Sequence, residues 1–261
     1  MLEAALAVVA GLLVGSFLNV CIYRWPRELS VASPRSFCPL CAHPVAWYDN
    51  IPLTSYLVLR GRCRHCQKPI PLRYPLVEAL TAGLFLAIVL VRGASPNALT
   101  LCVFGALSIG LLFSDLEERD LPDQFTLGGI VLGLVFAWFV PFSSSLFSLI
   151  LPDWNRHLLS VAESAFGAIV PAFLLWGVGA IYSLVRHKEG LGFGDVKMVA
   201  MIGAFLGVMG AAAVVMVGSL LGSVLGLAYI YGTHKDPGSY ELPFGTFLGV
   251  GAIAVALLSL R

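Results

Sequence analysis

The sequence is dominated by apolar stretches, several of which approach the ~20 residues that a helix needs to cross a bilayer. Charged residues make up only 12% of the chain, whereas a soluble domain carries about 25%, so most of the chain is not surrounded by water. The sequence therefore predicts an all-α polytopic membrane protein with about eight transmembrane helices. The expected helices are residues 3–22, 75–91, 98–114, 124–141, 159–185, 196–209, 211–232 and 243–260, and only Gly207 to Gly210 separate the sixth from the seventh.

The basic residues indicate which ends of these helices face the cytoplasm. If the loops alternate between the two sides, one side holds 13 of the 16 Lys and Arg residues, and the other holds Arg92, Arg156 and Arg261. Cytoplasmic loops carry the excess of Lys and Arg, so the richer side is predicted to be cytoplasmic and both termini periplasmic. No basic segment precedes the first apolar stretch, which is therefore expected to be a retained anchor rather than a cleaved signal peptide. The loops assigned to the cytoplasm are residues 23–74, 115–123, 186–197 and 233–242.

The one long polar segment, residues 23–74, contains two Cys-x-x-Cys pairs. They are Cys38 with Cys41 and Cys63 with Cys66, and 21 residues lie between the pairs. Two such pairs can give four thiolates to a tetrahedral zinc ion. A segment of about 50 residues cannot bury enough surface to fold alone, so a structural metal would replace the missing core. Two disulfides are the alternative, which the reducing cytoplasmic side disfavours.

The other potential metal ligands of the chain are expected to play no part in this site. His43 and His65 could each replace a thiolate, but four cysteines already complete a zinc site. Cys21 and Cys102 lie within apolar stretches and are expected to be small buried side chains. The predicted parts of the chain are a first transmembrane helix (1–22), a cytoplasmic zinc-binding insert (23–74) and a transmembrane core (75–261).

Acidic residues gather where two of the predicted helices meet the cytoplasmic side. Asp115 ends the third apolar stretch and Asp195 opens the sixth, so the two carboxyl groups can meet at one depth. Two carboxyl groups that lie close together share a proton. Such a pair can activate water and polarise a peptide carbonyl, as in aspartic proteases. The bare backbone at Gly190, Gly192 and Gly194 would let an extended peptide approach Asp195.

Several of these acids also have simpler interpretations. Spacing alone does not select Asp115 over Glu117, Glu118, Asp120 and Asp123, which follow it in "DLEERDLPD". The loop acids would ordinarily be solvated, and Asp123 would complement the dipole of the helix that it begins.

Three further charged residues have open roles. Asp195 could be a helix cap that pairs with Lys197, and Lys197 could instead tune the acids or meet lipid phosphate. Glu78 and Glu163 lie inside apolar stretches, where ionisable groups face a partner or a wet cavity. Glu78 could contact a substrate or cofactor, or pair with Arg73.

Five long motifs make the chain resemble the bacterial type 4 prepilin peptidases, the bifunctional leader peptidases and N-methyltransferases of type IV pilus and type II secretion systems. One difference is Thr246, where we expect proline after "PFG". The motifs are "GSFLNVCIYRWP" (15–26), the cysteine segment (38–82), "DLEERDLPDQFTLG" (115–128), "GLGFGDVKMVAMIGAFLG" (190–207) and "LPFGTFLGVGA" (242–252).

The resemblance implies a function and assigns residues to it. Asp115 and Asp195 would be the catalytic aspartates of a G-x-G-D protease, and the four insert cysteines would bind zinc. The enzyme would cut a basic leader after glycine in a prepilin or pseudopilin, and would methylate the new N-terminal residue with S-adenosylmethionine. It would act at the cytoplasmic face of the bacterial inner membrane, in contact with lipid and without a nucleic-acid partner. Lys197, Gly192, Gly194 and Glu78 would be candidates for substrate or cofactor contact.

Two other classes of protein are alternatives. A transporter would also have buried carboxylates, but transporters usually show two related halves with interrupted helices, and the cysteine insert has no counterpart in the second half. A membrane scaffold that docks partners through its zinc insert would leave the G-x-G-D motif without a purpose.

Overall fold

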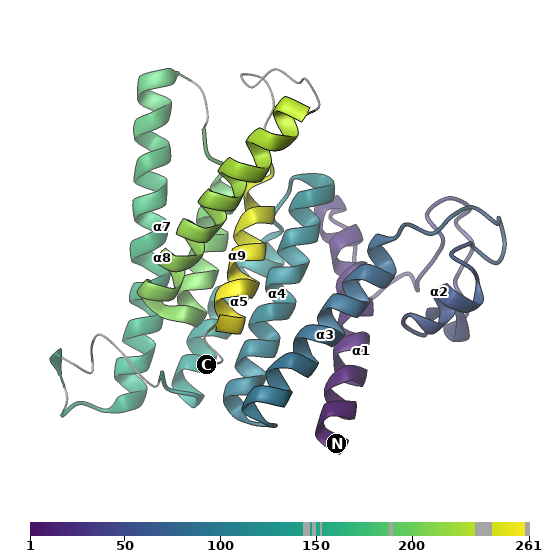
Figure 1. The fold of residues 1–261 in the computed structure, drawn as a ribbon, viewed down its shortest axis with the longest axis horizontal. Coiled ribbons are helices and arrows are strands. Elements are labelled where there is room, and N and C mark those ends of the chain that lie inside the picture. Colours follow the sequence, from purple (N-terminus) through teal and green to yellow (C-terminus); the bar gives the residue numbers. More distant parts are fainter. Residues whose placement is uncertain (143–146, 148–149, 152, 188–189, 233–241, 259–261) are drawn as a thin grey trace. The chain divides into compact units, whose positions relative to one another are not determined.

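The computed structural model describes residues 1–142, 147, 150–151, 153–187, 190–232 and 242–258. Within this part of the chain the structure is almost entirely helical (Figure 1), and its β pairing is confined to two isolated bridges, Phe37 with Pro44 and Arg62 with Pro69. The helices are α1 (Leu2–Arg24), η1 (Trp25–Arg27), η2 (Trp47–Asn50), α2 (Thr54–Val58), α3 (Arg73–Arg92), α4 (Pro96–Glu118), α5 (Asp123–Phe139), α7 (Arg156–Arg186), α8 (Phe193–Gly232) and α9 (Phe244–Leu258).

The prediction of an all-α polytopic membrane protein is confirmed. In the described residues five helices are long and apolar enough to cross a bilayer, namely α1 with η1, α3, α4, α7 and the 193–226 part of α8. Two further apolar helices, α5 and α9, have 17 and 15 residues. Each of the eight predicted stretches overlaps one of these seven helices, and the sixth and seventh both lie in α8. Residues 259–260 of the last stretch lie outside the described residues.

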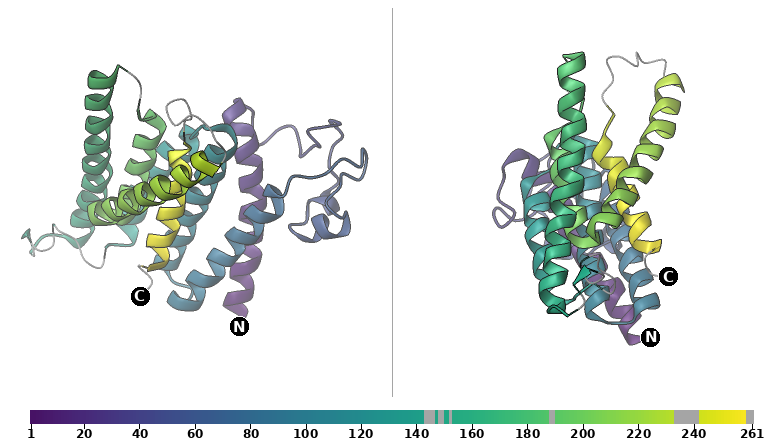
Figure 2. Two further views of the ribbon diagram at one scale, coloured as in Figure 1. Left: turned by 45° about the horizontal axis from the view of Figure 1, so that its top comes forward. Right: turned by 90° about the vertical axis from the view of Figure 1, so that its left-hand side faces the viewer.

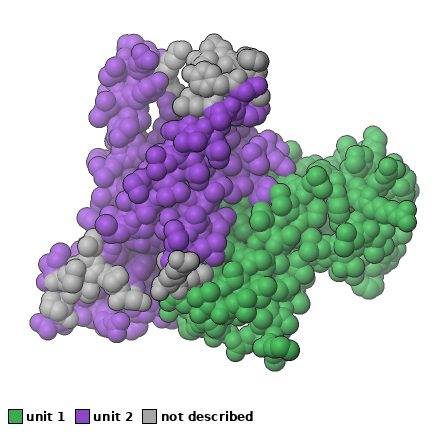
Figure 3. Space-filling model, in the orientation of Figure 1, with its two compact units in different colours: residues 1–110, 260 green, residues 111–259, 261 purple. Residues whose placement is uncertain are grey.

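The chain forms two compact units, which Figure 3 shows in different colours. Unit 1 contains residues 1–110 and unit 2 begins at Leu111. In unit 1, α1 packs along α3 (Figure 1). A Cβ atom on Gly15 would lie 2.7 Å from the Cα atom of Glu78, so the two backbones approach more closely than any other residue at position 15 would allow. The cysteine insert leaves the end of α1 and returns at the start of α3.

Unit 2 is built around the first half of α8. Helix α8 packs against α5, α7 and α9 (Figure 2). Its first half contacts α5 at Ala204 and α7 at Gly203, and its second half contacts α9 at Gly218. In the first half Met198, Val199, Met201 and Ile202 are fully buried. At Gly207 the backbone leaves the helical conformation, with φ 69° and ψ −177°, which is a conformation that favours glycine. This break lies where the sequence separates the sixth predicted helix from the seventh.

Candidate active site and metal centre

Asp115 lies in the last turn of α4, and the start of α9 holds its side chain. The residue is 6% exposed. Its Oδ2 atom accepts two hydrogen bonds from Thr246, one from the backbone N–H at 2.6 Å and one from the hydroxyl group at 2.8 Å. Thr246 belongs to the first turn of α9, where backbone N–H groups have no partner within the helix and readily bind an anion. The end of α4 and the beginning of α9 are therefore joined through this carboxyl group.

Asp195 lies in the first turn of α8, and its backbone N–H donates to the carbonyl of Gly192 at 3.1 Å. Its side chain is half-buried, and the carboxyl group of Asp115 acts on it electrostatically. Both aspartates belong to unit 2, and their carboxyl groups are close enough to interact electrostatically. What the pair does chemically stays a prediction.

Leu121 connects the segments that carry the two acids. A Cβ atom on Gly194, which precedes Asp195, would lie 3.2 Å from the Cβ atom of Leu121. A Cβ atom on Gly245, which precedes Thr246, would lie 3.1 Å from Asp115 Cγ and from Leu121 Cδ1. Leu121 itself is 7% exposed. The starts of α8 and α9 thus both contact Leu121, a buried leucine that follows α4.

The glycines of the G-x-G-D motif differ in their surroundings. Gly192 is exposed, and a Cβ atom there would have only Asp195 Oδ2 within 4 Å, at 3.4 Å. Gly194 instead packs against Leu121. Gly192 therefore leaves the backbone before Asp195 open to an approaching chain, whereas the missing side chain of Gly194 serves the internal packing.

Lys197 forms an ion pair with Asp123, and its Nζ atom lies 5.8 Å from the centre of the Phe193 ring. Asp123 begins α5 as predicted, but its ion pair with Lys197 could not be inferred from the sequence because 74 residues separate the two. This contact ties the start of α5 to the start of α8.

The insert contains two turns of the same backbone design, one for each cysteine pair. In the first, the N–H of Cys38 donates to the carbonyl of His43 at 2.9 Å, and the N–H of Ala42 donates to that of Cys38 at 2.8 Å. In the second, the backbone N–H of Cys63 donates to the carbonyl of Lys68 at 2.9 Å, and the N–H of Gln67 donates to the carbonyl of Cys63 at 2.9 Å. Ala42 and Gln67 have matching φ values of 56° and 57°. We call these turns the two knuckles.

The knuckles bring the four predicted sulfur ligands together. All six cysteines are free, and the Sγ atoms of the four insert cysteines lie within 4.8 Å of one another, with 3.9 Å between Cys38 and Cys66. A tetrahedral zinc ion with Zn–S bonds of about 2.3 Å requires sulfurs about 3.8 Å apart, so the donor set fits zinc. The backbone N–H groups of Cys66 and His65 lower the pKa of Cys63 to about 7, which favours the thiolate that binds metal.

The remaining histidine and cysteine predictions can be compared directly with the structure. The cluster consists of the four cysteines alone, while the rings of His43 and His65 stack on each other with centroids 3.6 Å apart. Cys21 and Cys102 are buried, as predicted.

Glu78 connects α3 to the insert. Its Oε2 atom accepts the backbone N–H of Leu53 at 2.8 Å, and the hydroxyl group of Ser16 also bonds to the carboxyl group. Glu78 is 8% exposed, and Leu53 has φ 56° and ψ −48°, which is unusual for a bulky residue. The carboxyl group therefore holds the insert in a strained conformation.

Sequence reasoning missed four residues around these sites: Ser16, Asn19, Leu121 and Thr246. The first two carried a signal, because they are polar residues one helical turn apart in an apolar stretch. Thr246 was noted only as a local difference in the last helix, yet it contacts Asp115 directly.

Comparison with known proteins identifies the family to which this chain belongs. Residues 9–92 match the model of the bacterial peptidase A24 N-terminal domain, and residues 102–227 match that of the type IV leader peptidase family. The chain is 36% identical to the type 4 prepilin-like proteins leader peptide-processing enzyme of Escherichia coli O78:H11, over 97% of this chain and 93% of that protein. The chain belongs to the type IV leader peptidase family.

Two other relatives in the family are similar to this chain over most of its length. The prepilin leader peptidase/N-methyltransferase of Aeromonas hydrophila is 34% identical over 94% of this chain and 87% of its own. The enzyme of the same name from Pseudomonas putida is 36% identical over 96% of this chain and 89% of its own length. No solved structure matches the chain. The first family match contains the four insert cysteines and the second contains both aspartates, whereas Thr246 lies outside both.

Proposed function

We propose that this chain is a membrane-embedded aspartic endopeptidase that removes the basic leader from type IV prepilins or type II secretion pseudopilins, and that it methylates the new N-terminal residue. The observation that carries the peptidase proposal is the convergence of Asp115 and Asp195, which come from helices 80 positions apart in the sequence, in a member of this family. The pair would lie at the cytoplasmic face of the inner membrane, where a substrate helix leaves the lipid and its leader begins.

The two carboxyl groups would divide the work of hydrolysis. The ionised one takes a proton from water, and the protonated one donates a hydrogen bond to the scissile carbonyl and stabilises the developing oxyanion. Because both Thr246 donors bind Oδ2 of Asp115, Oδ1 is the oxygen left to exchange a proton. Water attacks the carbonyl directly, so no acyl-enzyme forms.

The charges around the pair suit a basic leader. Glu117, Glu118 and Asp120 follow Asp115 and are exposed. An exposed group of negative charge attracts Lys and Arg side chains from a distance and raises the rate of encounter. The exposed Gly192 would then allow the extended cleavage segment to reach Asp195.

The methylation of the new N-terminal residue would use unit 1. The four cysteines would hold a structural zinc ion, which fixes the insert because a closed site of four thiolates has no open position for substrate. S-adenosylmethionine would supply the methyl group. The structural support for this half is the fit of the four sulfur atoms to a tetrahedral metal.

Purified Asp115→Asn and Asp195→Asn variants test the peptidase proposal. Each should lose prepilin cleavage, measured as a mobility shift, while its thermal transition stays close to that of the unmodified protein, because the substitutions are nearly isosteric. Asp153→Asn is the matched control, since Asp153 is an exposed aspartate of the same unit, and it should retain cleavage. Normal turnover by either asparagine variant would refute the pair.

A further inference from the structure

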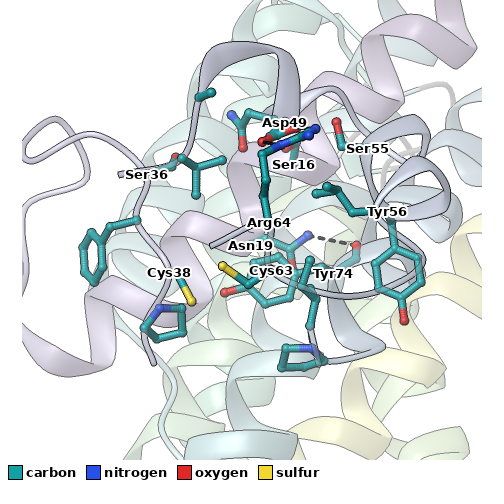
Figure 4. Close-up of a pocket in the computed structure, with 18 of the residues that line it drawn as sticks. Ser16, Asn19, Ser36, Cys38, Asp49, Ser55, Tyr56, Cys63, Arg64 and Tyr74 are labelled. Atoms are coloured by element: carbon teal, nitrogen blue, oxygen red, sulfur yellow. Dashed lines mark hydrogen bonds and ion pairs between the residues drawn. The ribbon is translucent and has the colours of Figure 1, made fainter. Parts of the chain in front are cut away.

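Unit 1 contains a cavity of about 400 Å³ between α1, the insert and the start of α3 (Figure 4). Ser16 and Asn19 line it from α1, Tyr74 and Glu78 from α3, and Tyr56 from the insert. A cavity of this size holds a small molecule rather than a peptide. Its wall also includes Cys38 and Cys63, so the cysteine cluster forms one side of it.

Asn19 leaves one hydrogen-bond acceptor of this cavity unused. The residue is 2% exposed, and its Nδ2 atom donates to the carbonyl groups of Tyr74 at 3.0 Å and Gly15 at 3.3 Å. Its Oδ1 atom is buried without a partner in the described part of the chain. Leaving a buried acceptor unpaired in this way destabilises the protein. A ligand that donates a hydrogen bond at this point would remove that destabilisation.

The charges of the cavity favour a positively charged ligand. Glu78 is a buried acid that faces the insert and bonds only neutral groups among its described contacts, Leu53 and Ser16. The basic residues of the wall are committed elsewhere or exposed. Arg24 donates to the carbonyl groups of Ser30 and Pro34, both at 2.7 Å, Arg64 pairs with Asp49 at 2.7 Å, and Lys68 is exposed.

We propose that this cavity binds S-adenosylmethionine, an inference that rests on the methyl-transfer half of the proposed function. The ligand is a cation with N–H and O–H donors and a flat purine ring, and the cavity offers an unpaired acceptor, a buried carboxyl group and tyrosine rings. Asn19 Oδ1 accepts a hydrogen bond from the ligand, and Glu78 attracts the sulfonium charge. Tyrosine faces favour both a purine ring and a cation.

The transfer balances without any further reactant. The neutral N-terminal amine of the cleaved substrate attacks the methyl carbon, so that an N–C bond forms while the S–C bond breaks. The S–C electron pair stays on sulfur, which becomes a neutral thioether, and the amine nitrogen then releases one proton to water. The product S-adenosylhomocysteine lacks the sulfonium charge, and so Glu78 holds it less tightly than the donor.

Binding of the two compounds to the full-length protein in detergent tests this assignment. Asn19→Ala should weaken binding of labelled S-adenosylmethionine at least tenfold. Glu78→Gln should weaken the donor more than S-adenosylhomocysteine, because only the donor carries the sulfonium charge. Thr81→Ala is the control, since Thr81 is a buried residue of the same helix that does not line the cavity, and it should bind as the unmodified protein does. All three should still cleave prepilin.

Two results would overturn the inference while leaving the peptidase intact. One is equal donor affinity in Asn19→Ala, Glu78→Gln and Thr81→Ala. The other is photolabelling by 8-azido-S-adenosylmethionine that maps to residues beyond 110 rather than to residues 16–78, a measurement that needs no variant to fold. If the unmodified protein binds no donor at all, the methyl-transfer half of the proposed function fails as well, and if it cleaves no prepilin, the peptidase half fails by itself.

Discussion

Replacing Thr246 by valine should slow leader cleavage without abolishing it. Valine has almost the same shape as threonine but no hydroxyl group. The substitution therefore removes the 2.8 Å hydrogen bond to Asp115 Oδ2 and keeps the 2.6 Å bond from the backbone N–H. Asp115 stays in place, but one of the two bonds that fix the rotation of its carboxyl group is lost.

The size of the effect follows from the type of bond. A hydrogen bond to a charged group contributes about 1.5–3 kcal/mol, and each 1.36 kcal/mol of transition-state stabilisation is a factor of ten in rate. If the bond acts fully in the transition state, kcat/KM should fall by about 10- to 150-fold. Because the hydroxyl group orients Asp115 and does not touch the leader, the loss should be in kcat, with KM nearly unchanged.

The assay is a time course of prepilin cleavage at several substrate concentrations, so that kcat and KM separate. Thr246→Ser is the matched control, because serine keeps the hydroxyl group and should stay within a few-fold of the unmodified enzyme. The reasoning fails if the valine variant keeps full kcat/KM. It also fails if the serine variant loses as much as the valine variant, since the hydroxyl group would then not be the cause.

Two other predictions concern the insert. Removal of metal by a chelator, or the double variant Cys38→Ser/Cys41→Ser, should make residues 23–74 sensitive to limited proteolysis and weaken donor binding, while leader cleavage continues; an insert that stays resistant would show that metal does not hold it. The hydrogen bonds from the Arg64 guanidinium hold the pKa of Asp49 below its usual range, so the stability from this pair is fully present above the ordinary aspartate pKa and disappears as pH falls through the lower folded value. Because the Arg64 side chain is exposed to water, the effect should be small. Asp49→Asn should remove this part of the acid dependence of the insert's proteolysis, and an unchanged dependence would contradict the prediction.

The features that could be predicted from the sequence are those that depend on short stretches of chain. Helix positions follow from local apolar composition, and the break at Gly207 falls among glycines that already interrupted the pattern. The cluster of four cysteines was predictable because each knuckle is a single turn around one Cys-x-x-Cys pair, so that spacing alone brings the two sulfur atoms of each pair together. Asp195 stood out for a similar reason, as a lone acid among glycines.

The features that could not be predicted depend on contacts between distant segments. Asp115 has four acidic neighbours, and only the resemblance to a family separated it from them. Its partner Thr246 lies 131 positions away, and nothing near Thr246 indicates where its hydroxyl group points. Glu78 was expected to pair with Arg73 or to contact a ligand, and its bond to Leu53 depends on a strained loop conformation that no propensity favours.

In the insert, the four cysteines of the two knuckles are separate in sequence from the 21-residue connection that lies between the knuckles. Each knuckle completes its turn with its own backbone bonds, so a metal held by the four cysteines would fix both ends of the 21-residue connection whatever side chains that connection contains. Leu53 and Tyr56 of this connection line the cavity. Substitutions in this connection can therefore change the shape of the cavity while the four cysteines stay unchanged.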